Sequence, residues 1–139
     1  MGKTNIHANL RGNMAFEMDI NGHTVTTDAT AENGGNGLGP SPKALLLAGL
    51  IGCSGIDIMT ITKKMRVEIE DVKVDIEAEA REEDPKIYTY IKVIYRFKGK
   101  DLTFDKLERA VKLSMEKYCG VAAMLEKAVP ITYEIKIEV

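Results

Sequence analysis

The sequence has few of the residues on which metal and nucleic-acid sites depend. Its 139 residues include no tryptophan, two histidines and two cysteines, and aromatic residues make up 6%. His7 and His23 do not lie at a metal-ligand spacing from each other or from either cysteine. The net charge of −2 provides no basic surface for a phosphate backbone. We therefore expect neither a metal ion nor a nucleic-acid partner.

The glycine-rich stretch 29–41 does not complete a phosphate-binding motif. Gly34 and Gly39 have the spacing of such a loop, but Pro40 stands where the motif requires lysine. No predicted strand leads directly into the stretch. We expect a connector here rather than a nucleotide site, and no bound cofactor.

The sequence also lacks export and membrane signals. Residues 1–7 contain no apolar region of the kind found in signal peptides. The apolar run 44–61 is interrupted by Asp57 and followed by Lys63 and Lys64, which leaves fewer than the roughly 20 apolar residues that span a bilayer. We expect a cytoplasmic protein without a membrane partner, in which cysteines remain thiols unless they form a redox pair.

The chain is expected to form one α+β domain, residues 1–139. Hydrophobic residues make up 45% and charged residues 29%, which is an ordinary globular composition. Alternating runs on either side of Asn21–Gly22 predict a β-hairpin, and a turn at 11–13 predicts a third short strand before it.

The second half of the chain alternates between strand and helix patterns. Alternating residues predict strands at 72–80 and 91–97, with a bulge near 70–71. A helix follows Thr103, is interrupted at Cys119–Gly120 and continues briefly. A last alternating strand starts at Pro130. These elements predict strands packed against two substantial helices.

The segment 40–66 predicts a central helix that is apolar nearly all round. A surface helix would have a polar stripe, and this one does not. We therefore expect it to be surrounded by protein, in part by a second subunit.

Both cysteines are associated with core helices, which leaves two interpretations open. Cys53 is either a small core hydrophobe or, if a cation reaches it, a nucleophile. Gly49 and Gly52 leave space beside it. Cys119 lies where one helix stops and another starts, so backbone N–H groups can point at its sulfur.

Two segments resemble the OsmC/Ohr family. Residues 39–57, which include Gly39-Pro40-Ser41-Pro42, Gly52-Cys53-Ser54 and Asp57, resemble its central helix. Residues 107–119 resemble its second cysteine helix, and their ending Glu-Lys-Tyr-Cys resembles a less-characterised branch. The similarity covers nearly the whole chain.

The resemblance implies an α+β fold with antiparallel strands around two central helices in an intertwined homodimer. It implies a thiol-dependent peroxidase for organic hydroperoxides, with active sites at the subunit interface. In this assignment Cys53 becomes a sulfenic acid and Cys119 resolves it as a disulfide, which an external dithiol reduces. Arg11 is the implied cation near the thiolate.

This sequence differs from the family's peroxidases at one position. Where they have a glutamate that orients the arginine, after the proline that starts the central helix, this chain has Lys43. This difference favours an alternative function, a dimeric small-ligand-binding or thiol-sensing module that is oxidised once without turnover. A structural protein with two inert cysteines is the third possibility.

Overall fold

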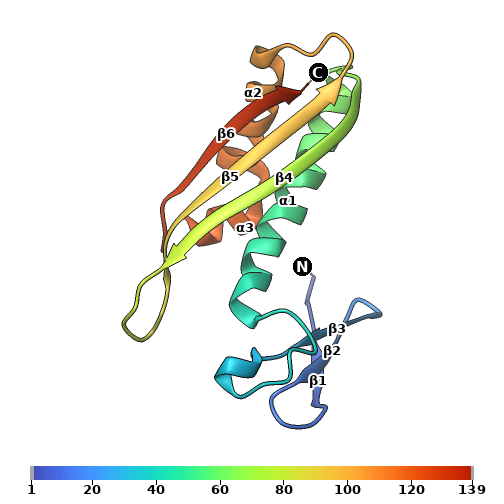
Figure 1. Cartoon of the computed structure of the whole chain (residues 1–139). Helices are drawn as coiled ribbons and strands as arrows, with labels where there is room; N and C mark the ends of the chain where they lie inside the picture. The colour runs from blue at the N-terminus through green and yellow to red at the C-terminus, as the bar shows by residue number, and fades with distance from the viewer. Residues whose placement is uncertain (1, 139) are drawn as a thin grey trace. The chain divides into compact units, whose positions relative to one another are not determined.

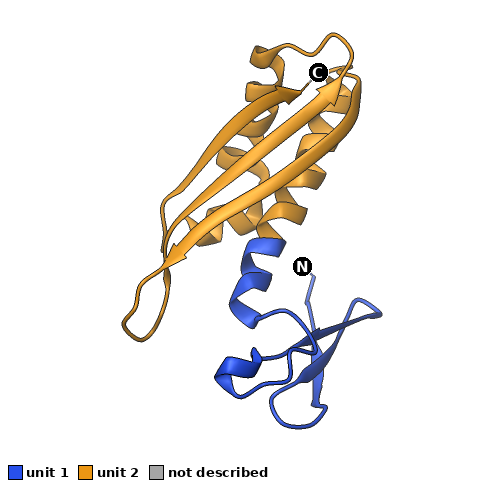
Figure 2. Cartoon of the chain, viewed as in Figure 1, with its two compact units in different colours: residues 1–48 blue, residues 49–139 orange. Residues whose placement is uncertain are grey.

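The computed structural model describes residues 2–138. The chain divides into two compact units, Met1–Ala48 and Gly49–Val139, and each is described here by itself (Figure 2). That the two fold together as one domain stays a prediction.

The first unit contains a three-stranded antiparallel sheet in the order β1-β2-β3. Its strands are β1 (His7–Leu10), β2 (Phe16–Ile20) and β3 (His23–Thr27). Asn21 and Gly22 join β2 to β3 with φ angles of 52° and 82°. Positive φ at both central residues is what a tight hairpin turn requires. The predicted hairpin and the third short strand are therefore confirmed.

The glycine-rich loop of this unit is organised by a buried carboxylate. Asp28 is 2% exposed, and its oxygens accept hydrogen bonds from the backbone N–H groups of Ala29, Asn36 and Leu38. These bonds, that from Leu38 foremost, hold the pKa of Asp28 below its ordinary value. The loop, which contains η1 (Ala31–Asn33), thus connects β3 to the helix as an ordered turn.

The predicted central helix is α1 (Pro42–Lys64), which starts in the first unit and runs into the second. Its buried residues recur at every fourth position: Leu50, Ser54, Ile58 and Thr62. Only one stripe of the helix is therefore buried within the chain. The helix has 23 residues, and a window of 18 of them has a mean hydropathy of 1.9. By length and composition alone α1 could therefore cross a membrane, so the argument from length was wrong.

The second unit contains a three-stranded sheet in the order β4-β5-β6. Its strands are β4 (Ile69–Ala80), β5 (Tyr88–Gly99) and β6 (Ile131–Glu138). The β4–β5 pair is antiparallel, and its register shifts between Ile69 and Asp71, which confirms the predicted bulge. The β5–β6 pair is parallel, so the expectation of antiparallel strands throughout was wrong.

The helical connection between β5 and β6 explains the parallel pair. It contains α2 (Phe104–Leu113), the π-helical turn η2 (Ser114–Tyr118) and α3 (Gly120–Leu125). A helical crossover lets the chain re-enter the sheet in the same direction, which a tight turn cannot do. Figure 1 shows α2, α3 and the later part of α1 on one face of this sheet. The core lies between these layers and includes the fully buried Tyr95 and Phe97 of β5.

Candidate active site

Cys53 lies in the middle of α1 and is half-buried. The space beside it is open within the chain, because a Cβ at Gly49, Gly52 or Gly55 would meet nothing within 4 Å. Glycine in a helix interior costs about 1 kcal/mol relative to alanine, so three of them around one cysteine indicate a need for close approach. The space predicted beside Cys53 is therefore confirmed for this unit.

Cys119 is buried, at 3% exposure, between η2 and α3. Its backbone is extended, with φ −75° and ψ 105°, and its sulfur caps α3 by accepting a hydrogen bond from the N–H of Ala122 at 3.4 Å. This confirms that an N–H group points at the sulfur. Burial nevertheless raises the pKa of Cys119 from 9.0 to about 11, because it outweighs the N–H donors of Ala122 and Val121.

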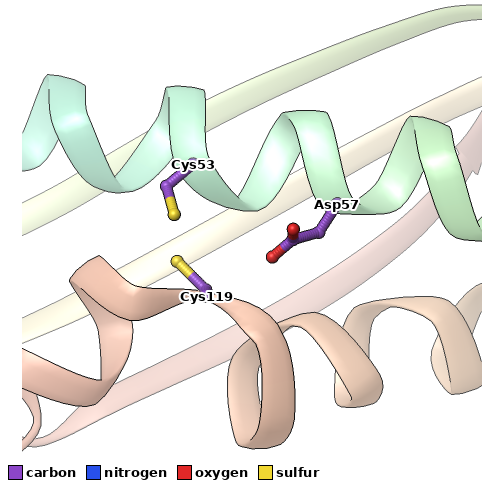
Figure 3. A group of neighbouring side chains, drawn as sticks. All are labelled: Cys53, Asp57 and Cys119. Atoms are coloured by element: carbon purple, nitrogen blue, oxygen red, sulfur yellow. The ribbon is translucent and has the colours of Figure 1, made fainter. Parts of the chain in front are cut away.

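The two cysteines face each other inside the second unit. Figure 3 shows their sulfurs pointing toward one another, Cys53 from α1 and Cys119 from the start of α3. The two sulfurs and a carboxylate oxygen of Asp57 all lie within 4.8 Å of one another. Both cysteines are free thiols. The structure thus brings together the two cysteines that the family resemblance implied as partners.

Asp57 is the member of this group that sequence reasoning did not assign to the site. In the sequence it stands out only as a polar interruption of the apolar helix and as part of a motif. The available signal was its spacing, because Asp57 follows Cys53 by four residues and therefore lies one turn along on the same face of α1. Ser114 of η2 places its Oγ 3.0 Å from Asp57 Oδ2.

A row of buried hydroxyl groups continues from Asp57 into the core. Ser114 Oγ lies 3.0 Å from Ser54 Oγ, which lies 2.6 Å from Tyr95 Oη. A carboxylate can only accept, and a serine has one proton to donate. An ionised Asp57 therefore accepts a hydrogen bond from the hydroxyl of Ser114. Ser114 in turn accepts from Ser54, and Ser54 accepts from Tyr95. Burial is the main cause that raises the pKa of Tyr95 to about 12, so it remains a donor.

The donors Cys53, Asp57 and Cys119 are also the group in the described part of the chain that could hold a metal ion. Thiolate and carboxylate donors are of the kinds that bind Zn²⁺, at about 2.0–2.3 Å. The expectation of no metal site, like that of no cofactor, stays a prediction.

A cavity of about 580 Å³ opens beside Asp57. Its wall is partly apolar, with Ile61, Met65 and Leu113, and includes the cations Lys64 and Arg109. Thr60 and Tyr118 complete the lining.

Arg11, the third residue proposed for the site, belongs to the first unit, whereas Cys53 belongs to the second. Within its unit Arg11 has a carboxylate partner, because its Nε lies 3.4 Å from Glu17 Oε2. The role of Arg11 beside the thiolate stays a prediction. Lys43 occupies the second position of α1.

Comparisons with known proteins identify the family. Residues 34–134 match the OsmC family, described as OsmC-like protein. Protein YhfA of Escherichia coli is 41% identical over 116 residues, which are 84% of each chain. A hypothetical protein from Aquifex aeolicus is 35% identical and superposes over 100% of both chains with a TM-score of 0.85. An organic hydroperoxide resistance protein OsmC from Legionella pneumophila, at 20% identity, covers 98% of both chains with a TM-score of 0.71 and shows the same fold.

The family match covers the segments from which the site is built. It includes α1 with Cys53 and Asp57, and the crossover with Ser114 and Cys119. The match also answers whether α1 spans a membrane, because in this family the apolar helix is a core helix and not a membrane span. The chain therefore belongs to the OsmC-like protein family.

Proposed function

We propose that this protein is a cysteine-based peroxidase that reduces organic hydroperoxides. The observation that carries the proposal is the pair of facing sulfurs in Figure 3, one half-buried on Cys53 and one buried on Cys119. A peroxide can approach the more accessible sulfur, whereas the buried sulfur is positioned to meet the product.

The reaction consists of two balanced steps. The Cys53 thiolate attacks one oxygen of the hydroperoxide, the O–O bond breaks, and the alkoxide leaves and gains a proton to become an alcohol. Cys53 is oxidised to a sulfenic acid. The sulfur of Cys119 then attacks Cys53, the S–O bond breaks, and water and a disulfide are formed. An external dithiol returns the disulfide to two thiols.

Two observations support an organic substrate over hydrogen peroxide. The cavity beside Asp57 has apolar residues in its wall, which suit a hydrocarbon chain. The Legionella relative of the same fold is described as an organic hydroperoxide resistance protein. That description belongs to the relative and enters here as part of the proposal.

A homodimer and the cation Arg11 complete the proposal. The second-unit part of α1 leaves Ile56 at 69% and Met59 at 48% exposure, and such a contiguous apolar surface favours a protein partner. We assign that partner to a second copy of the chain. In this proposal Arg11 is the cation beside the Cys53 thiolate. Glu17 orients Arg11, in place of the glutamate that the family's peroxidases have where this chain has Lys43. The proposed location is the cytoplasm.

One observation favours a second function. The family's peroxidases have a glutamate where this chain has Lys43, the second residue of α1. A site with a less well-oriented cation would react with peroxide slowly and serve as a thiol sensor that is oxidised once.

Steady-state consumption of cumene hydroperoxide with dithiothreitol separates the two functions. The peroxidase proposal predicts many turnovers per chain, faster than with hydrogen peroxide and absent in Cys53→Ser. Consumption that stops after one equivalent per chain would favour the sensor. No consumption at all would overturn both.

A further inference from the structure

We infer that the Asp57 carboxylate carries the proton of the resolving step, taking it from the Cys119 thiol and giving it to the oxygen that leaves Cys53. The inference rests on the proposed function, because it concerns the second of the two steps above. It assigns a catalytic residue that neither the sequence nor the family resemblance provides.

Asp57 is placed where a proton carrier between the two cysteines must lie. A carboxylate oxygen of Asp57 lies within 4.8 Å of both sulfurs, between which the bond must form. In Figure 3 the carboxylate group extends from α1 toward the two sulfurs. A proton carrier must reach both the donor and the leaving oxygen, and the oxygen added to Cys53 enlarges that side chain within this small space.

A hydrogen bond holds the Asp57 carboxylate in its orientation. Ser114 Oγ donates this bond to Oδ2 at 3.0 Å. Ser114 is itself held by the buried Ser54, which in turn contacts Tyr95 Oη. Such a row of buried hydroxyl groups rigidifies the group at its end.

The resolving step requires a group that moves a proton from the Cys119 thiol to the oxygen leaving Cys53. A thiol whose pKa is raised to about 11 is almost entirely protonated at neutral pH, and only its thiolate attacks well. The hydroxide that leaves a sulfenic acid must gain a proton. One carboxylate that accepts the first proton and donates it to the second position meets both requirements, and the balance remains disulfide plus water.

Other polar groups lie near Asp57 on its cavity side. Lys64 of α1 and Arg109 of α2 line the same cavity, as does the hydroxyl-bearing Tyr118 of η2. A carboxylate oxygen of Asp57 lies within 4.8 Å of both sulfurs, whereas Lys64 and Arg109 lie on its cavity side.

The experiment follows each step of a single turnover in Asp57→Asn. Asparagine keeps an oxygen for Ser114, so the hydrogen bond survives while the base is lost. After one equivalent of cumene hydroperoxide, the formation of sulfenic acid at Cys53 and its conversion to the disulfide are followed separately, and we expect the conversion to be about 100-fold slower. Below the pKa of about 11 of Cys119, the variant's resolving rate should rise about tenfold per pH unit, and the wild type's should rise less. Asp57→Glu should restore the flatter profile.

A matched control and a peroxide-free measurement separate the two proposals. Glu77→Gln removes the same charge from an exposed position of β4 and should change neither rate. With dithiobis(nitrobenzoate), Cys53 releases the first thionitrobenzoate and Cys119 the second, without any peroxide. If Cys53 never forms sulfenic acid but Asp57→Asn still slows the second release, the peroxidase proposal fails and the role of Asp57 as the base for Cys119 stands. Unchanged rates and pH profiles of both resolving reactions would overturn the role of Asp57 and leave the peroxidase proposal intact.

Discussion

Ser54 Oγ lies 2.6 Å from Tyr95 Oη, and both side chains are fully buried. The contact joins α1 to β5 at the residue directly after Cys53. It therefore fixes the helix turn that carries the proposed nucleophile to the central strand of the sheet.

The Tyr95 hydroxyl makes the protein less stable at high pH. Its pKa rises from 10.0 to about 12 on folding, chiefly through burial, so the folded chain keeps a proton that the unfolded chain releases. This contribution to stability is present below pH 10 and is lost as the pH rises to about 12. A rise of this size corresponds to about 2–3 kcal/mol. Cys119 adds a loss in the same direction from pH 9.0 to about 11.

Tyr95→Phe tests this contribution through urea unfolding at several pH values. At neutral pH the free energy of unfolding of the variant should be lower by about 1 kcal/mol, because the hydrogen bond to Ser54 is missing. Between pH 10 and 12 the variant should lose less further stability than the wild type. Tyr90→Phe, an exposed change on the same strand, is the control and should follow wild type. An alkaline loss in Tyr95→Phe as large as in wild type contradicts the assignment.

The pair formed by Arg11 and Glu17 should matter for the first chemical step. If Glu17 orients Arg11, Glu17→Gln should slow sulfenic acid formation about tenfold and Arg11→Ala should slow it further, measured by stopped flow with cumene hydroperoxide. The double variant should equal Arg11→Ala alone, since Glu17 acts through Arg11. Additive effects would show that Glu17 acts independently.

Lys43→Glu should speed the same step. The helix dipole stabilises a carboxylate in the first turn of α1 and destabilises a lysine there, and each effect is worth about 0.3–1 kcal/mol. The new carboxylate would also restore the residue type with which the family's peroxidases orient the arginine. The acceleration should disappear in the presence of Arg11→Ala. A Lys43→Glu chain that is no faster, or is faster without Arg11, shows that Arg11 is not the cation.

Gly55 provides a test of the homodimer. A Cβ at this position meets nothing within 4 Å in the chain, so the first side-chain carbon of Gly55→Leu has room there, and the change gains helix propensity. If a second copy packs on this face of α1, the leucine should weaken the dimer by sedimentation at low micromolar concentration. Glu68→Leu, just before β4, is the control for added apolar surface. A wild-type chain that sediments as a compact 15.3 kDa monomer contradicts the dimer.

The sequence was sufficient to predict most elements because their signals are local. The turn at Asn21–Gly22, the bulge near 70–71 and the interruption at Cys119–Gly120 depend on neighbouring residues, and all are observed. The direction of β6 was predicted wrongly because it depends on the path of the helical crossover, which alternation within a strand does not encode.

The site was predicted only in part for the same reason. Each cysteine was recognised from its own helix, but Asp57 acquires a role through Ser114, 57 residues away, and through Cys119. Similarly, Glu17 as the partner of Arg11 follows from strand pairing in the hairpin rather than from a motif.

The central claim is that Cys53 reacts first and Cys119 second. Mass spectrometry with a sulfenic-acid trap, after one equivalent of cumene hydroperoxide, locates the first oxidation in Cys53→Ser and Cys119→Ser chains. We predict a trapped sulfenic acid on Cys53 in Cys119→Ser and no oxidation in Cys53→Ser. A trapped sulfenic acid on Cys119, with Cys53 unmodified, would contradict the account.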